Sequence, residues 1–86
     1  MSNSSIIERL RTLADDLEAG RTSIEHFADV ILGHTEALEQ INYRQIKEAQ
    51  MISAQLRNAI HSGDSELIDV AAVVEWVRQW TAGVPA

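Results

Sequence analysis

The chain contains no cysteine among its 86 residues, and proline occurs only at Pro85. Without cysteine, disulfide bonds, thiolate nucleophiles and thiolate metal sites are all excluded. The four glycines are scattered along the sequence, so no glycine-rich loop for phosphate groups is present. Thiol redox chemistry and nucleotide binding by a glycine loop are therefore excluded as functions.

Long apolar runs are also absent. The longest, residues 70–74, is flanked by Asp69 and Glu75 and is far shorter than the ~20 residues that span a bilayer. The opening Met-Ser-Asn-Ser-Ser lacks the basic and apolar regions of a secretory signal. These absences predict a cytoplasmic protein with no membrane partner. The length predicts a single helical domain over residues 1–86, with flexible ends at 1–4 and 82–86.

The net charge is −6 at pH 7, and residues 15–39 carry the negative excess, because seven acidic side chains stand there beside one base, Arg21. Such a local field repels phosphate backbones and favours a basic protein as partner. The bases Arg44, Lys47 and Arg57 are too few and too mixed with acids for a nucleic-acid surface, so no nucleic-acid partner is expected. The predicted acidic partner face consists of Asp15, Asp16, Glu25, Asp29, Glu36 and Glu39.

Apolar residues recur at helical spacing through most of the chain, which predicts an all-α fold. The first helix is expected over about residues 5–19, because Ser5 and Glu8 fit a capping box and Gly20 suits the left-handed residue that ends a helix. A second capping pattern, in residues 22–25, starts the next helix after a tight turn.

The apolar positions from Ile24 to Ile60 keep one helical phase, including across Gly33. This pattern predicts one long central helix over about residues 23–61, with room for a kink at Gly33. The alternative is a compact four-helix bundle with a break near Gly33, which agrees better with the ~11–12 residues of an average helix. A third option places the break near Asn42.

The final helix is expected over about residues 65–81, because Gly63 is a stop signal and Asp64 or Ser65 can cap a new helix. The helices at 5–19 and 65–81 would then lie antiparallel along the two halves of the long central helix. The predicted architecture is therefore a long helix flanked by two shorter ones.

The final helix is apolar around most of its circumference, which exceeds what one neighbouring helix can cover. Its Leu67, Val70, Val74 and Val77 are expected to face the long helix. Because nothing else in the chain is free to cover the opposite side, the sequence predicts a homodimer. The predicted oligomer interface consists of Val73, Trp76 and Trp80.

Two polar residues, His34 and Gln45, fall on the apolar stripe of the predicted long helix. In such a seam a polar side chain can fix the register or the oligomeric state. Alternatively, His34 lies at an exposed kink and Gln45 at the gap between the two flanking helices. The three histidines lack the spacing of metal ligands on a helix, so neither a metal nor another cofactor is expected.

No catalytic constellation is visible in the sequence. General acid–base catalysis needs carboxylates in a concave, partly desolvated site, whereas the acidic side chains are expected on an exposed helix face. The serines stand at predicted helix starts, where capping accounts for them. The sequence therefore predicts a non-catalytic, small acidic helical protein that acts as a homo-oligomer on a basic protein surface, as an inhibitor, immunity or regulatory protein does. The alternative is a structural or assembly protein whose function is self-association.

Overall fold

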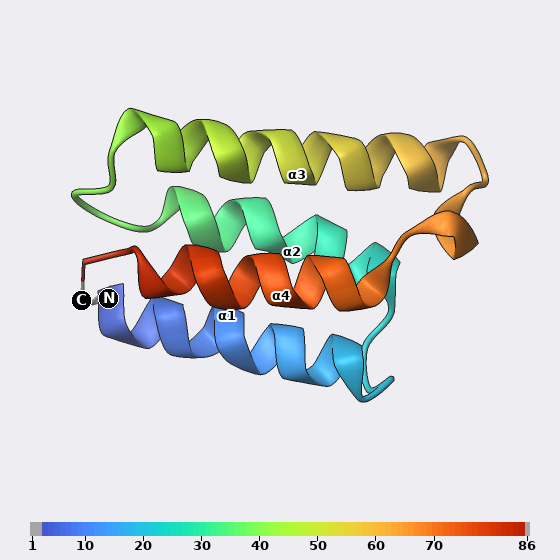
Figure 1. Cartoon of the computed structure of the whole chain (residues 1–86), viewed down its shortest axis with the longest axis horizontal. Coiled ribbons are helices and arrows are strands. Elements are labelled where there is room, and N and C mark those ends of the chain that lie inside the picture. Colours follow the sequence, from blue (N-terminus) through green and yellow to red (C-terminus); the bar gives the residue numbers. More distant parts are fainter. Residues whose placement is uncertain (1–2, 86) are drawn as a thin grey trace.

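The computed structural model describes residues 3–85 and folds them into a bundle of four α-helices (Figure 1). The all-α class and the helical bundle are therefore confirmed. A short 3₁₀ turn, η1, at Ser65–Leu67 precedes the last helix. The four helices are α1 at Asn3–Glu18, α2 at Ile24–Glu36, α3 at Tyr43–His61 and α4 at Val70–Ala82.

The connection between α1 and α2 forms as the sequence predicts. Gly20 adopts a left-handed φ of 76°, and the Arg21 amide donates to the carbonyl of Asp16 at 2.8 Å, which closes the last turn of α1. The Ser23 hydroxyl accepts a hydrogen bond from the His26 amide and caps α2. At its other end α1 already includes Asn3, so Ser5 lies inside the helix rather than at its start.

The predicted long helix over residues 23–61 is wrong, because α2 ends at Glu36 and α3 begins at Tyr43. Residues 37–42 form the connection, and the Cα trace extends only 35 Å in its longest direction, against the roughly 58 Å of such a helix. Gln40 has a φ of 61°, which no continuous helix allows.

The break is encoded at Asn42 rather than at Gly33. Asn42 and Gln45 form a full capping box, with the Asn42 side chain accepting from the Gln45 amide and the Gln45 side chain accepting from the Asn42 amide. Gly33 lies inside α2, so the four-helix alternative is right in kind but wrong about its break. The break expected near Asn42 is confirmed. The helical spacing of apolar residues continues across this break because Leu38 and Ile41 pack on the core although they lie outside the helices.

The last helix starts later than predicted. Asp69 caps α4 by accepting from the Ala72 amide, and residues 65–67 form η1 instead of the first turn of a helix from 65 to 81. Asp64 makes no side-chain capping bond. Leu67 is consequently 78% exposed. The prediction that it faces a neighbouring helix is therefore wrong.

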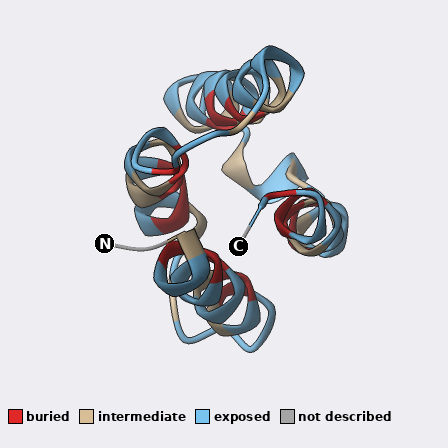
Figure 2. Ribbon diagram, turned by 90° about the vertical axis from the view of Figure 1, so that its left-hand side faces the viewer, coloured by how far each residue is buried: buried red, intermediate tan, exposed pale blue. Residues whose placement is uncertain are grey.

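The bundle consists of two helix pairs placed side by side. α1 packs mainly on α4, α2 packs mainly on α3, and α1 also contacts α2. α3 and α4 approach each other less closely, and Figure 2 shows them on two sides of the bundle with their buried residues facing inward. The largest fully buried apolar side chains come from three helices: Leu10, Phe27, Ile31, Val74 and Val77.

Both chain ends belong to the fold as far as they are described. The Asn3 amide group donates to the carbonyl of Pro85 at 2.9 Å, which ties the start of α1 to the segment after α4. Val84 is buried in the core. Of the predicted flexible ends, Met1, Ser2 and Ala86 lie outside the described residues, whereas 3–4 and 82–85 are placed in contact with the bundle.

Candidate interaction surface

Three carboxylates form a stripe along the outer face of α2. Glu25, Asp29 and Glu36 are all exposed, and their spacing of four and seven residues places them on one side of a helix. The opposite side of α2 carries Phe27 and Ile31, which are buried in the core. Within residues 3–85, none of the three carboxylates takes part in an ion pair. We call these three residues the α2 acidic stripe.

The remaining members of the predicted acidic face lie elsewhere. Asp15 pairs with Arg78 of α4 at 2.9 Å, and Asp16 pairs with Arg21 at 2.8 Å. Glu39 stands in the connection between α2 and α3, where its backbone carbonyl and amide both bond the Asn3 side chain. The six predicted residues therefore do not form one face, and the structure brings three of them together on α2.

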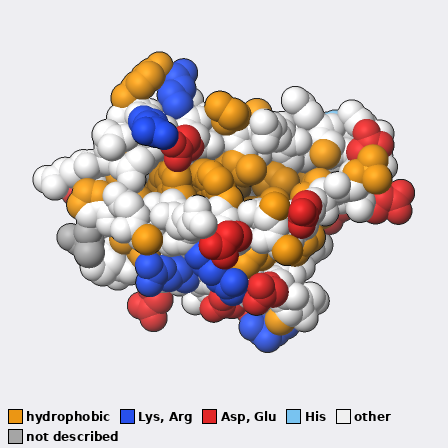
Figure 3. All heavy atoms as spheres, in the orientation of Figure 1, with side chains coloured by type: hydrophobic (Ala, Val, Ile, Leu, Met, Phe, Trp, Pro, Cys, Tyr) orange, Lys and Arg blue, Asp and Glu red, His pale blue; other side chains and the backbone are white. Residues whose placement is uncertain are grey.

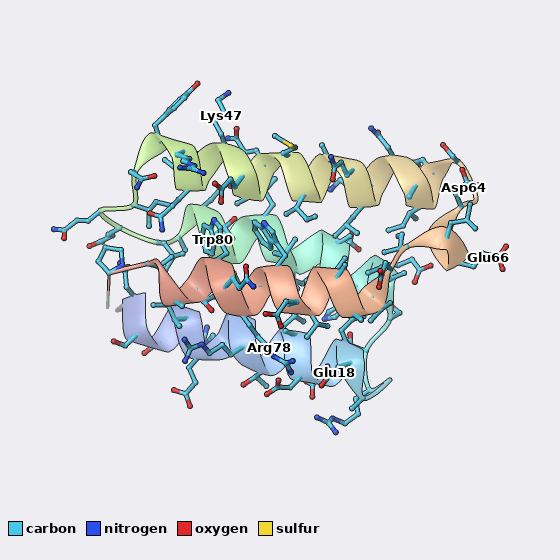
Figure 4. All side chains as sticks on the ribbon, viewed as in Figure 1. Glu18, Lys47, Asp64, Glu66, Arg78 and Trp80 are labelled. Carbon is cyan, nitrogen blue, oxygen red and sulfur yellow. The ribbon has the colours of Figure 1, made fainter. Side chains whose placement is uncertain are left out.

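Arg78 neutralises the acidic end of α1. Its guanidinium contacts Glu18 at 3.1 Å as well as Asp15, and Figure 4 shows the Arg78 and Glu18 side chains meeting between α4 and α1. The hydrogen bonds that Arg78 donates, first to Glu18 and second to Asp15, raise the pKa of its guanidinium above the ordinary value. Asp15 and Glu18 of α1 therefore have a counter-ion within the fold, whereas the three acids of the α2 acidic stripe have none among the described residues.

Two basic side chains of α3 stand near the start of the stripe without pairing. Arg57 and His61 line a hollow of about 290 Å³ together with Glu25 and Asp29. No ion pair joins these groups in the described part of the chain. The carboxylates of the stripe are thus free to pair with an incoming cation.

An apolar pocket lies at the other end of the stripe. It measures about 200 Å³ and lies where α2 ends and α3 begins, with Glu36 at its rim. The sequence analysis did not predict this pocket, because its walls come partly from the connection that the long-helix interpretation removed. We call it the α2–α3 pocket; its lining residues are Leu32, Thr35, Glu36, Leu38, Ile41, Ile46, Ala49 and Gln50.

The predicted oligomer interface is largely occupied within the single chain. Val73 and Trp80 are each 6% exposed, and Trp80 donates from Nε1 to the Gln45 carbonyl of α3 at 3.1 Å. Trp76 stacks on Trp80 with ring centroids 5.7 Å apart and is half-buried. The premise that nothing else in the chain covers Val73 and Trp80 is therefore wrong, and the bond to Gln45 shows that the start of α3 contributes to covering Trp80.

An apolar band remains visible along the edge between α3 and α4. Figure 3 shows hydrophobic side chains gathered in this band. Trp76 and Ile52 are both partly buried against the core, and Ile52 follows Gln45 by two helical turns on the same face of α3. We call this feature the α3–α4 edge.

Gln45 joins two helices, as expected for a polar residue in a helix seam. Its side-chain amide donates to the carbonyl of Gly83 at 2.8 Å, while its own carbonyl accepts from Trp80. These bonds tie the first turn of α3 to the end of α4. Whether Gln45 also sets an oligomeric state stays a prediction.

His34 is not at a kink, because α2 runs unbroken past it. Its Nδ1 lies 3.0 Å from the Val30 carbonyl oxygen of the same helix, and the ring is half-buried. It lines an open, polar groove of about 500 Å³ between α1 and α2 together with His26 and Asp16. Among residues 3–85 no three His, Cys, Asp or Glu side chains are grouped so that they could hold a metal ion.

Comparisons with protein-family models, with curated proteins and with solved structures found no match to this chain. In the described part of the chain, no helix combines the length and the apolar character needed to cross a membrane. The α2 acidic stripe, the α2–α3 pocket and the α3–α4 edge are therefore the features on which a function can be argued. All three are suited to contact with another macromolecule.

Proposed function

We propose that this protein is a non-catalytic interaction protein that binds a basic surface of another protein through the α2 acidic stripe, in the manner of a small inhibitor, immunity protein or regulator. The observation that carries the proposal is the contrast in pairing between two helices. Asp15, Asp16 and Glu18 of α1 pair with Arg78 and Arg21, whereas the exposed stripe has no ion-pair partner in residues 3–85. Unpaired charge of one sign on one face favours a partner of the opposite sign.

The stripe is expected to act mainly through association rate and specificity. Exposed ion pairs contribute only ~0–1 kcal/mol each, but a charged face steers a complementary partner and accelerates its association. From Glu25 to Glu36 the stripe runs roughly 16 Å along the helix, which matches about three turns of a helical partner. Binding should therefore weaken steeply as salt is added.

Charge reversal tests the proposal directly. At low salt the tagged wild-type protein should capture basic proteins. The variant with lysine at all three stripe positions should fail to capture them. A matched control carries the same change in net charge at three exposed acids that lie outside α2. This control is Asp64→Lys, Glu66→Lys and Glu75→Lys. Equal retention of basic proteins by both triple variants would contradict the proposal.

Self-association is the second candidate function, and the α3–α4 edge favours it. A second copy of the chain that covers the apolar band seen in Figure 3 would remove it from water. Trp76 of α4 and Ile52 of α3 are partly buried apolar residues that such a contact could cover further. The protein would then be a homodimer or an assembly component, with the acidic side chains outward. Sedimentation equilibrium tests this candidate, because Trp76→Gln should convert a dimer into a monomer while leaving the buried Trp80 in place. A wild-type chain that sediments as a 9.6 kDa monomer would refute it.

A further inference from the structure

The α2–α3 pocket has the size and the walls to hold one apolar side chain. Its volume is about 200 Å³, and an apolar cavity of ~150 Å³ accommodates a benzene-sized group. Leu38 and Ala49 form buried wall positions, while Ile46 is 37% exposed at the opening. A leucine or phenylalanine side chain bound there would remove this solvent-exposed apolar surface from water.

The polar groups of the pocket are arranged for a cationic neighbour. The Thr35 hydroxyl donates to the Leu32 carbonyl at 2.9 Å, so it is satisfied within α2. Glu36 and Gln50 are exposed at the rim, and in the described residues Glu36 has no ion-pair partner. An apolar hollow with one unpaired carboxylate at its mouth suits an apolar side chain that is followed or preceded by a base.

The bases of the first turns of α3 do not neutralise Glu36. Arg44 pairs with Glu48 of its own helix at 3.1 Å. The Lys47 ammonium lies over the Tyr43 ring, 5.3 Å from its centroid, and Figure 4 shows the Lys47 side chain pointing away from the bundle. The negative charge at the rim is therefore available to a partner.

We propose that the α2–α3 pocket receives one apolar anchor side chain of a basic partner segment, whose neighbouring lysine or arginine side chains pair with Glu36 and the rest of the α2 acidic stripe. This inference rests on the proposed function and adds to it the chemistry of the segment that is recognised. A buried apolar anchor surrounded by complementary charge is a common arrangement at the centre of protein interfaces. A second copy of this chain is a poor occupant, because its net charge of −6 opposes the same stripe.

The stripe also sets the spacing of the partner's charges. Asp29 and Glu25 lie roughly 10 Å and 16 Å along α2 from Glu36. A helical partner segment would therefore carry its anchor at one end and its bases about two and three turns away. This pattern is that of a basic amphipathic helix lying along the α2 acidic stripe with one end at the α2–α3 pocket.

A pair of synthetic peptides tests the inference. The probe is an alanine-based helix of about 16 residues, long enough to form a helix, with lysines along one face and a single leucine at one end of that face. Its twin carries alanine in place of the leucine. Fluorescence anisotropy at low salt should show that the leucine peptide binds wild-type protein about tenfold more tightly than its twin, as expected for an apolar group entering a fitted pocket.

Variants of the protein locate the anchor. Ile46→Gln, at the opening of the pocket, should bring the affinities of the two peptides close to equality. Met51→Gln is the matched control, because Met51 is an exposed apolar residue of the same helix outside the pocket, and it should keep the tenfold difference. Far-UV circular dichroism checks that both variants keep their helical content.

The outcomes separate the inference from the proposed function. Equal, salt-sensitive binding of both peptides to the wild-type protein would overturn the anchor and leave the acidic stripe supported. A tenfold preference that survives Ile46→Gln would also overturn the anchor, because the leucine would then bind elsewhere. If neither peptide binds at low salt, the proposed function fails, and the anchor fails with it.

Discussion

Each of the two helix pairs in the bundle buries a hydroxyl side chain, but only one of these hydroxyls has hydrogen-bond partners. Thr81 of α4 and Ser53 of α3 are both hydroxyl residues that are only 2% exposed. The Thr81 hydroxyl donates to the Val77 carbonyl at 2.8 Å and accepts from Arg11 at 3.3 Å. The Ser53 hydroxyl is buried and has no hydrogen-bond partner within residues 3–85. The α1–α4 pair therefore satisfies its buried polar atoms, and the α2–α3 pair leaves one unsatisfied.

The surroundings of the two pairs differ in the same direction. Between α1 and α4, Leu10, Val74 and Val77 are almost completely buried, and Arg78 adds ion pairs at the rim. Between α2 and α3, the small side chains Ala49 and Ser53 face the core, and hollows of about 200 Å³ and 290 Å³ lie toward the two ends of the pair. The α1–α4 pair also borders a hollow, of about 570 Å³, but polar side chains form most of its lining. Close packing and satisfied polar groups stabilise a fold, so the α1–α4 pair carries more of the stability.

This difference teaches where binding is expected. Binding regions are commonly drawn from the less stable parts of a fold, and ligand pockets are concave and mostly apolar. Both the α2 acidic stripe and the α2–α3 pocket belong to the less completely packed pair. The stability of the α1–α4 pair allows the other pair to keep an imperfect surface for recognition.

The largest effect is expected from a cavity in the α1–α4 pair. Leu10→Ala should lower the free energy of unfolding by about 2–5 kcal/mol, as large-to-small changes in a close-packed core do. Leu56→Ala in α3 should cost less, because the core-facing side of α3 already carries the small side chains Ala49 and Ser53. Urea denaturation followed by circular dichroism measures both values. A loss at Leu56 as large as that at Leu10 would break the comparison.

The two buried hydroxyls provide the next test. Ser53→Ala should raise the free energy of unfolding by about 1–2 kcal/mol, because it removes a buried polar group that has no partner and leaves a better helix former. Thr81→Val, its counterpart in α4, should lower it by about 1 kcal/mol, since two hydrogen bonds are lost. Opposite signs in the same urea experiment would sharpen the comparison, and a destabilising Ser53→Ala would contradict it.

The fold class and the connection between α1 and α2 were predicted correctly from the sequence, because these features depend on local chemistry. Gly20 and Ser23 fix the end of α1 and the start of α2 through their own backbone and side-chain bonds. The favoured long helix missed the break before α3, which only the third option placed near Asn42, because apolar periodicity records which residues face the core and not which of them are helical. Leu38 and Ile41 satisfied the period from a connection.

The candidate surface was predicted only in part, for a reason of tertiary structure. Charge density along the chain does not show which carboxylates acquire counter-ions from distant residues. Arg78 lies 60 residues or more from Glu18 and Asp15 in the sequence, so its pairing with α1 was not visible before the fold was known. The stripe residues remained unpaired on the outer face of α2.

Two glycines test the corrected course of α2. Gly33 lies inside the helix with open space where a Cβ would stand, so Gly33→Ala should stabilise the protein by about 0.5–1 kcal/mol. Gly20 has the same open space but a φ of 76°, so Gly20→Ala should destabilise it by about 1 kcal/mol. Thermal unfolding followed by far-UV circular dichroism compares the two variants. If Gly33→Ala instead destabilised the protein, the result would argue for a kink at Gly33 and against a regular α2.

The smallest effect is expected at the ion pairs that distinguish the acids of α1 from those of α2. Arg78→Gln removes the counter-ion of Asp15 and Glu18 and should lower the melting temperature slightly at low salt, because both carboxylates then repel each other. The difference from wild type should vanish near 1 M salt, where charges are screened within ~3 Å. Arg44→Gln, which breaks only the exposed pair with Glu48, is the control and should change the melting temperature less. If Arg78→Gln lowered the melting temperature by the same amount at every salt concentration, the Arg78 side chain would stabilise the α1–α4 pair by packing. The ion pairs of Asp15 and Glu18 would then not distinguish α1 from α2 electrostatically.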